Sequence, residues 1–395
     1  MDVALISHEY PPFIFGGIGT FTHEIAEGLS RKGINVHVIT GIPKSFNSVG
    51  DSAVQQTDEN GVNVLRIPYP SFPPRNIVFQ LWNFKKLSRI IQSLNIDVFH
   101  GQCGSTFPLL TILKKEAPLI VTFHDSPMME KISSTQSILH GGSLGDLRTY
   151  LVGYPAWKFT YQKELHYSKL AVTVSKSLKS ELIVEMGQKY EHKLRFLHNG
   201  VNIEALDKTY GKCDDHVEES DETILFAGRL FWRKGALNII AMAYLLQKKQ
   251  ANFRIIVHGD GPLFNKMRAK ISSLGLKNIE LKGFTAKEEL VESMKRSKFV
   301  AIPSIYEACP MILLESMCLG KIPLMLNLPF SSELTENGKY GLLANDAKGL
   351  IEQLTSAKKN FSIDYLSKEI RTFARNTYDI NSVASKYINI YREFC

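Results

Sequence analysis

Two glutamates spaced eight residues apart, Glu307 and Glu315, are well suited by type and position to hold a hydroxyl-rich ligand. A carboxylate accepts several hydrogen bonds. At about 1.5 Å per helical residue the two groups would lie about two turns apart and could bind different parts of one ligand. Taken alone, such a pair is more often a solvated loop residue and an exposed helix residue.

A helix N-terminus is predicted immediately after Glu307. Pro310 suits the first helical position because its missing N–H would be unpaired there in any case, and Gly320 is a suitable stop. Such a terminus offers unpaired N–H groups and the positive end of the helix dipole. It therefore favours an anionic ligand such as a phosphate beside Glu307.

Two cations, Arg229 and Lys234, follow a predicted strand that ends at Ala227. Arg229 can bind a diphosphate through two parallel hydrogen bonds, and Lys234 can bind it as a point charge. An isolated pair of this kind is more often a pair of solvated surface charges. The next predicted strand, residues 253–257, ends in a turn containing Gly259 on the same side of the sheet.

A glycine-rich loop with Gly16 and Gly17 follows the first predicted strand, residues 3–7, and leads into a helix. Glycine lets the backbone approach a phosphate closely because no Cβ intervenes. The loop lacks the full GxGxxG spacing of a dinucleotide site, so a tight strand-to-helix turn explains it equally well.

His124 follows the predicted strand 119–123. Polar residues at the carboxyl end of a parallel strand face the crevice where open α/β sheets bind ligands. Asp125 is placed to orient the imidazole, since a carboxylate fixes a histidine tautomer. A lone histidine in such a position is nevertheless more often satisfied structurally.

Short apolar runs alternate with helical patterns in both halves of the chain, which predicts an α/β fold with parallel, doubly wound sheets. The 395 residues suffice for two domains. We place the first at residues 1–200 and the second at 201–376. The polar run 212–221 is predicted to be a mobile interdomain connection.

Composition limits the classes of function. The chain is 44% apolar and 22% charged, with a net charge of +8 that favours acidic ligands but marks no nucleic-acid face. Five cysteines without paired spacing suggest reduced thiols in the cytoplasm. We expect no signal peptide, no membrane span and no metal site built from cysteines.

Residues 77–91 place apolar side chains on one stripe, with Lys85, Lys86 and Arg89 beside Trp82. A surface helix that buries its stripe in the core is the simpler explanation. The alternative is a peripheral contact with an anionic membrane, which suits basic groups beside an exposed tryptophan.

Together these motifs resemble family 4 of the nucleotide-sugar glycosyltransferases, the retaining group with the GT-B fold. The resemblance spans nearly the whole chain, and its strength lies in the order of the motifs. The matching segments are Pro11-Pro12 with Gly16-Gly17, His124-Asp125, Asn199-Gly200-Val201, Gly228-Arg229 with Lys234-Gly235, Gly259-Asp260-Gly261-Pro262 and the two glutamates.

The resemblance implies two facing Rossmann-like domains with a cleft between them, the last helix, about 377–395, joining the first domain. It implies that Arg229 and Lys234 hold the donor diphosphate, Glu315 its ribose and Glu307 its sugar, with Gly259, Met311 and Ile312 also binding the donor. Gly16 and Gly17 would close over the phosphates and His124 would lie beside the sugar. The expected catalytic set is Glu307, His124, Lys234 and Arg229.

The resemblance further implies transfer of a hexosyl unit from a UDP- or GDP-sugar to a lipid-linked or saccharide acceptor. No cofactor and no metal are expected, and no Asp-x-Asp motif is suitably placed. Since Glu307 would grip sugar hydroxyls rather than attack the anomeric carbon, same-face attack assisted by the leaving phosphate is favoured over double displacement.

Because the sequence departs from the family pattern at two places, it does not identify the donor sugar. Pro310 stands where relatives often have glycine, and Leu328–Glu333 stands where they often have Gly-Gly before a glutamate. The alternative function is a nucleotide-sugar 2-epimerase of the same architecture. A third possibility is a sugar-nucleotide-binding subunit without catalysis.

Overall fold

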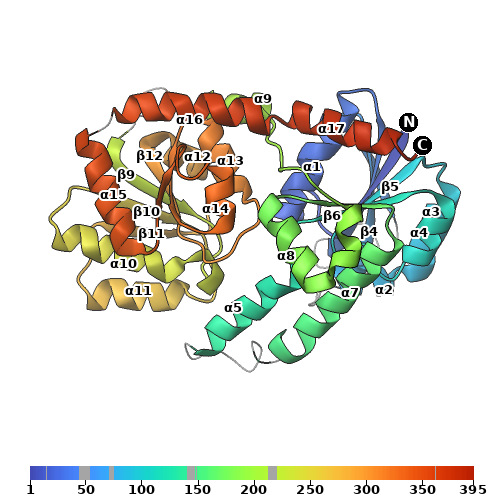
Figure 1. Cartoon of the computed structure of the whole chain (residues 1–395), viewed down its shortest axis with the longest axis horizontal. Coiled ribbons are helices and arrows are strands. Elements are labelled where there is room, and N and C mark those ends of the chain that lie inside the picture. The colour runs from blue at the N-terminus through green and yellow to red at the C-terminus, as the bar shows by residue number, and fades with distance from the viewer. Residues whose placement is uncertain are drawn as a thin grey trace. The chain divides into compact units, whose positions relative to one another are not determined.

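The computed structural model describes residues 1–14, 16–43, 54–70, 75–139, 147, 149–211, 220–360 and 362–395. Most of the predicted connection 212–221 therefore lies outside the described residues. The chain divides into two compact units (Figure 1). Unit 1 comprises Met1–Lys131, Leu147–Asn202 and Asp379–Cys395, and unit 2 comprises Ile132–Asp146 and Ile203–Tyr378.

The described part of unit 1 contains an eight-stranded sheet with the order β3-β4-β2-β1-β5-β6-β7-β8. Its pairs are parallel, apart from the antiparallel pair of β3 and β4. The strands are β1 (Asp2–Ile6), β2 (Asn35–Pro43), β3 (Gln55–Glu59), β4 (Val62–Tyr69), β5 (Val98–Gln102), β6 (Leu119–Phe123), β7 (Leu170–Thr173) and β8 (Leu194–Phe196).

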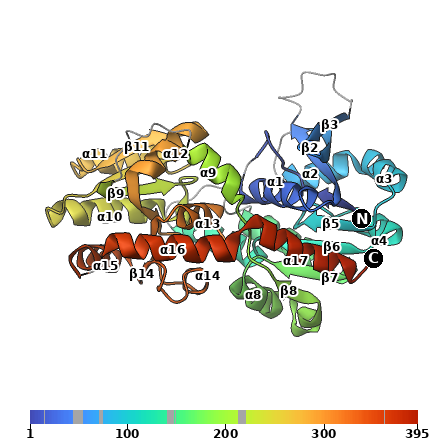
Figure 2. The same cartoon turned by 90° about the horizontal axis from the view of Figure 1, so that it is seen from above.

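Helices surround this sheet, as the two perpendicular views show (Figures 1 and 2). They are α1 (Gly17–Ser30), α2 (Arg75–Trp82), α3 (Phe84–Ser93), α4 (Leu110–Glu116), the π-helical turn η2 (Thr149–Gly153), α7 (Tyr154–Tyr167), α8 (Lys176–Met186), the 3-10 turn η3 (Gln188–Lys193) and the C-terminal α17 (Ile380–Arg392). Helix α5 (Pro127–Leu139) begins in unit 1, and its residues from Ile132 onward are assigned to unit 2.

The helix predicted from the apolar stripe of residues 77–91 is interrupted at Asn83. Its buried side chain donates from Nδ2 to the carbonyls of Pro68, at 3.1 Å, and Phe79, at 3.3 Å. Because these bonds tie the chain to the end of β4, the helical path stops there and restarts at Phe84. The single helix expected from the apolar spacing is therefore two, α2 and α3.

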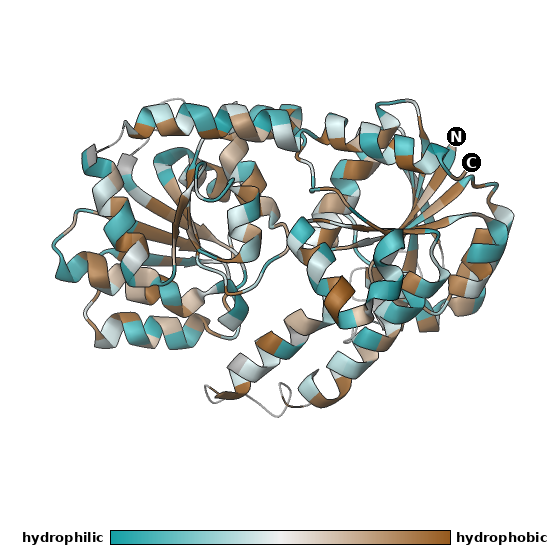
Figure 3. Ribbon diagram, viewed as in Figure 1, coloured by the Kyte–Doolittle hydropathy of each residue, from teal (hydrophilic) through white to brown (hydrophobic). Residues whose placement is uncertain are grey.

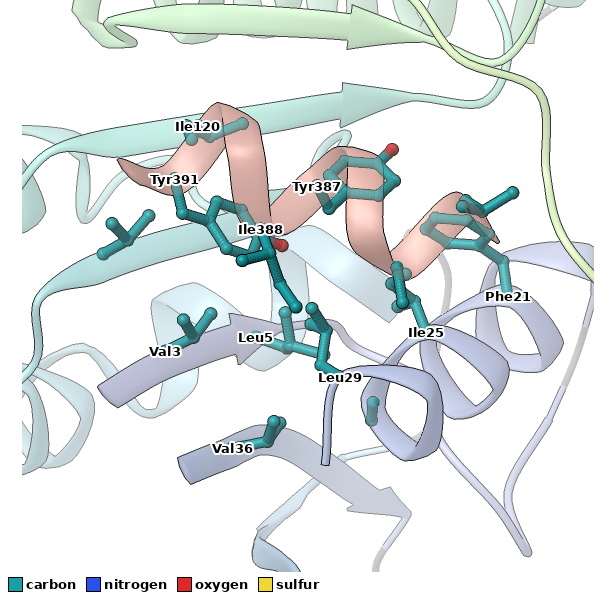
Figure 4. Packing of buried hydrophobic residues seen from close by; sticks show 14 of the residues in the cluster. Val3, Leu5, Phe21, Ile25, Leu29, Val36, Ile120, Tyr387, Ile388 and Tyr391 are labelled. Atoms are coloured by element: carbon teal, nitrogen blue, oxygen red, sulfur yellow. The ribbon is translucent and has the colours of Figure 1, made fainter. Parts of the chain in front are cut away.

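The C-terminal helix α17 belongs to the core of unit 1, where it packs beside α1 over the sheet (Figure 4). Its Tyr387, Ile388 and Tyr391 form one buried cluster with Leu5 and Leu29. Fully burying a large apolar side chain stabilises a fold by roughly 1.5–3 kcal/mol. Residues at opposite ends of the sequence therefore stabilise the same core.

Within its described residues, unit 2 contains a six-stranded parallel sheet with the order β11-β10-β9-β12-β13-β14. The order reverses beside β9, which is paired with both β10 and β12. The strands are β9 (Ser220–Ala227), β10 (Arg254–His258), β11 (Ile279–Gly283), β12 (Ser297–Ile302), β13 (Ile322–Leu326) and β14 (Leu342–Ala344).

The helices of unit 2 connect these strands and cover them. They are α9 (Ile203–Gly211), the 3-10 turn η4 (Trp232–Lys234), α10 (Ala236–Lys248), α11 (Phe264–Ser273), α12 (Lys287–Arg296), α13 (Met311–Cys318), α14 (Pro329–Leu334), α15 (Ala347–Asn360) and α16 (Ile363–Tyr378).

The strands of both sheets are mainly apolar, as their brown colour shows (Figure 3), which agrees with sheets covered on both faces. The predicted α/β architecture of two parallel-sheet units is thus confirmed. In the described part of the chain, no helix combines the length and the apolar character needed to cross a membrane.

Candidate active site

In unit 2 the segment after β9 carries the predicted cations. Gly228 has a φ of +158° and leads into Arg229, whose guanidinium carbon lies 5.3 Å from the centre of the Phe231 ring. The guanidinium of Arg233 lies 5.2 Å from the centre of the same ring. Both cations are attracted to the ring electrostatically, so Phe231 holds two arginines beside the end of β9.

Gly235 joins this segment to the loop after β12. It has a φ of +70°, and a Cβ at this position would lie 1.9 Å from the carbonyl oxygen of Pro303. Two hydrogen bonds link the same segments, from Ile305 N to Arg233 O at 2.9 Å and from Asn238 Nδ2 to Pro303 O at 3.1 Å. Only glycine allows this contact, which fixes η4 against the loop leading to Glu307.

Glu307 is surrounded by positive charge and hydrogen-bond donors. Lys234 Nζ lies 2.5 Å from its Oε1, Ser304 Oγ donates to the same oxygen at 3.0 Å, and an Arg233 nitrogen lies 3.8 Å from its Oε2. Only 7% of the Glu307 side chain is exposed. The structure thus brings together Glu307 and Lys234, which were predicted, with Arg233 and Ser304, which were not.

Burial of Glu307 by itself would raise the pKa of its carboxyl. The charges of Lys234 and Arg233, with hydrogen bonds from Lys234 and Ser304, outweigh that effect and hold the pKa below its ordinary value. Glu307 is therefore a carboxylate at neutral pH. It can accept hydrogen bonds from hydroxyl groups but cannot serve as a general acid.

Helix α13 starts at Met311, with Pro310 as its N-cap residue, one position later than predicted. Gly320, with a φ of +79°, follows the last turn as expected. The first N–H groups of a helix have no partner within it, so Met311 and Ile312 present donors at the helix start. Glu315, half-buried, lies one turn further along α13.

Gly259 follows β10, and the structure gives it a packing role. A Cβ there would lie 1.9 Å from the carbonyl oxygen of Gly228, and the Gly228 N–H donates to His258 O at 3.0 Å. Its φ is +139°. The glycine thus allows the turn after β10 to pack directly on the segment that carries Arg229.

In unit 1, Gly16 and Gly17 are exposed at the start of α1. The Gly16 N–H donates to the carboxylate of the buried residue Glu9 at 3.0 Å. Gly16 is extended, with a φ of −167°. The close contact is at Gly19, where a Cβ would lie 3.1 Å from atoms of both Glu9 and Ile14.

His124 lies after β6, and its Nε2 lies 2.7 Å from Gln102 Oε1. Because the amide oxygen can only accept, Nε2 carries the proton and Nδ1 is an acceptor. Burial lowers the pKa of His124 to about 3, with a smaller contribution from His100. The ring is thus neutral and is held by Gln102, whereas Asp125, the expected partner, accepts a hydrogen bond from Tyr161.

Glu164 on α7 is a buried acid that the sequence did not single out. It accepts from the Thr106 hydroxyl at 2.7 Å and from the N–H groups of Gly104 at 3.0 Å and Thr106 at 3.3 Å. Burial raises its pKa to about 7 despite these bonds. These contacts anchor α7 to the loop after β5, so the group has a structural role.

Four cysteines in the described residues, Cys103, Cys309, Cys318 and Cys395, are free thiols. No group of three or more His, Cys, Asp or Glu side chains in the same part of the chain is arranged to hold a metal ion.

Two family models match consecutive parts of the chain. Residues 15–205 match the model described as Glycosyltransferase Family 4, and residues 214–376 match the model described as Glycosyl transferases group 1. The first match falls largely in unit 1 and the second in unit 2.

Relatives match over nearly the full length. An uncharacterised glycosyltransferase of Methanocaldococcus jannaschii is 25% identical, covering 99% of this chain and 98% of its own. The alpha-monoglucosyldiacylglycerol synthase of Streptococcus pneumoniae is 20% identical over 94% of this chain and 82% of its own.

Solved structures share the fold. Sucrose-phosphate synthase from Thermosynechococcus elongatus matches with a TM-score of 0.74 at 15% identity, covering 100% of this chain and 98% of its own. Anabaena HepE, in complex with UDP-glucose, matches with a TM-score of 0.68 at 16% identity over 100% of both chains.

The two parallel-sheet units and these matches define a glycosyltransferase with the GT-B fold. Within that class, the chain belongs to glycosyltransferase family 4.

Proposed function

We propose that this glycosyltransferase transfers a hexosyl unit, with retention at the anomeric carbon, from a UDP- or GDP-sugar to a lipid-linked or saccharide acceptor. The observation that carries the proposal is the cluster of Lys234, Arg233 and Ser304 around the Glu307 carboxylate. It places a fixed anion that can bind sugar hydroxyls directly beside cations that can bind a diphosphate.

In the proposed mechanism the cations act on the leaving group. As the glycosidic bond breaks, negative charge develops on the diphosphate, and preorganised donors stabilise it most effectively in a partly buried site. Arg229, Lys234 and the first N–H groups of α13, from Met311 and Ile312, are the proposed donors. They would neutralise the diphosphate without a metal ion.

Glu307 is proposed to hold the sugar rather than attack it. Its lowered pKa and its ion pair with Lys234 suit a carboxylate that accepts hydrogen bonds from hydroxyl groups. Retention would then follow from same-face attack assisted by the departing phosphate. Glu315 is proposed to bind the ribose, and Gly259 to shape the donor site by packing on Gly228.

In unit 1, His124 is proposed to bind a sugar hydroxyl. Its Nε2 is held by Gln102, so Nδ1 can accept a hydrogen bond. The exposed backbone at Gly16 and Gly17, at the start of α1, is proposed to bind phosphate of the donor.

The test is incubation of the protein with UDP-glucose, UDP-galactose, UDP-N-acetylglucosamine and GDP-mannose, together with saccharides or membrane lipid extracts. We expect release of UDP or GDP and a product whose anomeric configuration, measured by NMR, equals that of the donor. An inverted product would overturn the retaining mechanism. Conversion of the sugar while the nucleotide stays attached would indicate an epimerase instead.

We also propose that unit 1 contacts an anionic membrane surface through the α2–α3 segment. Leu81 is 57% exposed, Trp82 60% and Phe84 39%, and they border a hollow of about 490 Å³ with Lys85 and Lys86. Residues 75–96 contain four basic and no acidic side chains. Exposed aromatic and basic groups together suit the interface of an anionic bilayer, which agrees with a lipid-linked acceptor.

A further inference from the structure

Arg233 is a cation of the candidate site that has no part in the proposed leaving-group chemistry, for which Arg229 and Lys234 are the donors. Only 17% of its side chain is exposed, and its Nη1 lies 3.8 Å from Glu307 Oε2. A guanidinium stays protonated at any pH that a folded protein tolerates. A permanent positive charge is thus placed beside the Glu307 carboxylate.

Two contacts hold Arg233 in this position. Its carbonyl oxygen accepts a hydrogen bond from Ile305 N at 2.9 Å, which ties the backbone of η4 to the loop that leads to Glu307. Its guanidinium carbon lies 5.2 Å from the centre of the Phe231 ring, whose negative face attracts the cation. Backbone and side chain are therefore both oriented by their neighbours, so the charge stays near the carboxylate.

The two oxygens of Glu307 face different cations. Oε1 lies 2.5 Å from Lys234 Nζ and also accepts from Ser304 Oγ at 3.0 Å, whereas Oε2 lies 3.8 Å from Arg233. The first contact is a hydrogen-bonded ion pair, and the last is beyond hydrogen-bond distance. Lys234, Arg233 and the Ser304 hydroxyl together hold the pKa of this carboxyl below its ordinary value. Lys234 is the direct partner, and a small movement of the guanidinium would make Arg233 a second one.

The proposed function sets a second task for Lys234. Its single positive charge would face both the Glu307 carboxylate and the donor diphosphate, whose two phosphates each carry one negative charge. A nearby anion raises the pKa of a carboxyl, and burial acts in the same direction, since only 7% of the Glu307 side chain is exposed. The two arginines on the Phe231 ring and Lys234, set against Glu307, leave two positive charges that balance the diphosphate. Without Arg233 the balance is one charge short.

We propose that Arg233 is a positioning residue that becomes the ion-pair partner of Glu307 when Lys234 turns to the donor diphosphate, an inference that rests on the proposed function. Arg233 itself touches neither sugar nor phosphate. It keeps Glu307 charged, so the carboxylate continues to accept hydrogen bonds from the sugar. An opposite charge at this range lowers the pKa of a carboxyl by about one to three pH units. Without that charge, Glu307 should take up a proton when the donor binds.

The test measures proton uptake on donor binding by the full-length protein. The ligand is whichever of UDP-glucose, UDP-galactose, UDP-N-acetylglucosamine and GDP-mannose binds the wild type best, because the diphosphates of these compounds do not titrate near neutral pH. Calorimetric titration in buffers of different ionisation enthalpy gives the number of protons taken up. At about pH 6 we expect none for wild type and up to about one for Arg233→Gln. The variant's loss of affinity should be greatest at about pH 8 and should shrink by up to about tenfold per pH unit as the pH falls.

Three further variants complete the test. Arg233→Met removes the charge but keeps an unbranched apolar stem beside Phe231, and it should behave as Arg233→Gln does. Arg233→Lys keeps the charge and should take up no proton. Arg268→Gln is the matched control, since Arg268 is an exposed arginine of unit 2 whose guanidinium carbon lies 4.9 Å from the centre of the Phe264 ring. It should bind the ligand as wild type does.

The possible results separate this inference from the proposed function. A loss of affinity in Arg233→Gln that is equal at every pH, without proton uptake, would make Arg233 a diphosphate ligand and overturn the inference. Wild-type affinity without proton uptake would overturn it as well. So would the failure of both charge-free variants to fold, because the charge would then be needed by the fold itself. In each case the proposed function stands. Failure of the wild type to bind any of the four nucleotide-sugars would instead overturn the proposed function, and this inference with it.

Discussion

Lys234 and Glu307, 73 positions apart in the sequence, lie with Nζ and Oε1 separated by 2.5 Å. The pair joins the segment after β9 to the loop after β12, the two strands that lie side by side where the sheet order reverses. Because Glu307 is nearly buried, its charge depends on this partner. The contact thus links a group proposed to bind diphosphate to one proposed to bind sugar.

Replacing Lys234 with alanine should lower turnover by at least about a hundredfold, the usual effect of removing one donor that stabilises transition-state charge. The loss follows from the missing charge on the departing diphosphate and from the unpaired Glu307. The measurement is kcat and kcat/KM for release of the nucleoside diphosphate. Lys266→Ala, which removes an exposed lysine lying 5.0 Å from the Trp232 ring centre, is the control. Near-normal turnover of Lys234→Ala would refute the assigned role.

Gly235→Ala should impair both stability and catalysis. The new Cβ would lie 1.9 Å from Pro303 O at a φ of +70°, so the loop carrying Glu307 must move. We expect a loss of roughly 1–3 kcal/mol in unfolding free energy and a fall in kcat of about a hundredfold, as expected for groups misplaced by about 1 Å.

Gly275→Ala provides the matched control for this prediction. Gly275 also has a positive φ, +58°, but a Cβ at this position would meet no other atom within 4 Å. The substitution should lower the thermal midpoint by its backbone strain alone and leave kcat unchanged. Equal loss of kcat in the two variants would mean that the Pro303 contact has no special role in positioning Glu307.

The membrane contact proposed for unit 1 can be measured by co-sedimentation with vesicles. Trp82→Ala should weaken binding to phosphatidylglycerol vesicles about tenfold or more, because a large apolar side chain would no longer be buried. Replacing Lys85 and Lys86 with glutamine should weaken it further, by about 1 kcal/mol per charge. Val184→Ala, at an apolar residue of unit 1 that is 86% exposed, is the control. Equal binding by all the variants would contradict the proposal.

Local signals predicted the fold and the elements that carry the site. Pro310 and Gly320 bracket α13 to within one residue, because caps and stops act over a few positions. The hairpin of β3 and β4 was not among the predicted elements. Asn60 and Gly61, both with positive φ, connect β3 and β4, and this dipeptide is a strong signal for a hairpin. The sequence of β3, QQTDE, contains no apolar residue, so it lacks the apolar pattern from which the other strands are predicted.

The contacts that complete the site could not be predicted in this way. Arg233 is one of two adjacent cations, and its place beside Glu307 depends on the contact between Gly235 and Pro303, which are distant in sequence. Gln102 holds His124 because β5 and β6 are neighbours in the sheet. Local sequence patterns carry no information on such pairings, so they predict the adjacent Asp125 as the partner of His124 instead of Gln102.

His100 provides a last prediction, on stability. It is fully buried in unit 1, with Nδ1 2.7 Å from the Tyr391 hydroxyl of α17 and Nε2 2.7 Å from Thr122 Oγ1. Burial lowers its pKa to about 3, against about 6.5 for an exposed histidine. Below pH 6.5 the unfolded chain therefore binds a proton that the folded chain does not. Stability is full above pH 6.5 and falls as the pH decreases toward 3.

One such histidine lowers the unfolding free energy by about 1.4 kcal/mol per pH unit in this window. In His100→Gln, the fall in unfolding free energy between pH 6.5 and 5.0 should therefore be smaller than in wild type by about 2 kcal/mol. His124, whose pKa is also lowered to about 3, should still contribute its own part of that fall in the variant. Urea unfolding at the two pH values measures the difference. His166→Gln, at an exposed histidine of α7, should behave as wild type. Retention of the full pH dependence of the unfolding free energy in His100→Gln would contradict the prediction. It would mean that His100 takes up its proton in the folded chain as readily as in the unfolded chain, and that its hydrogen bond to Tyr391 does not require a neutral ring.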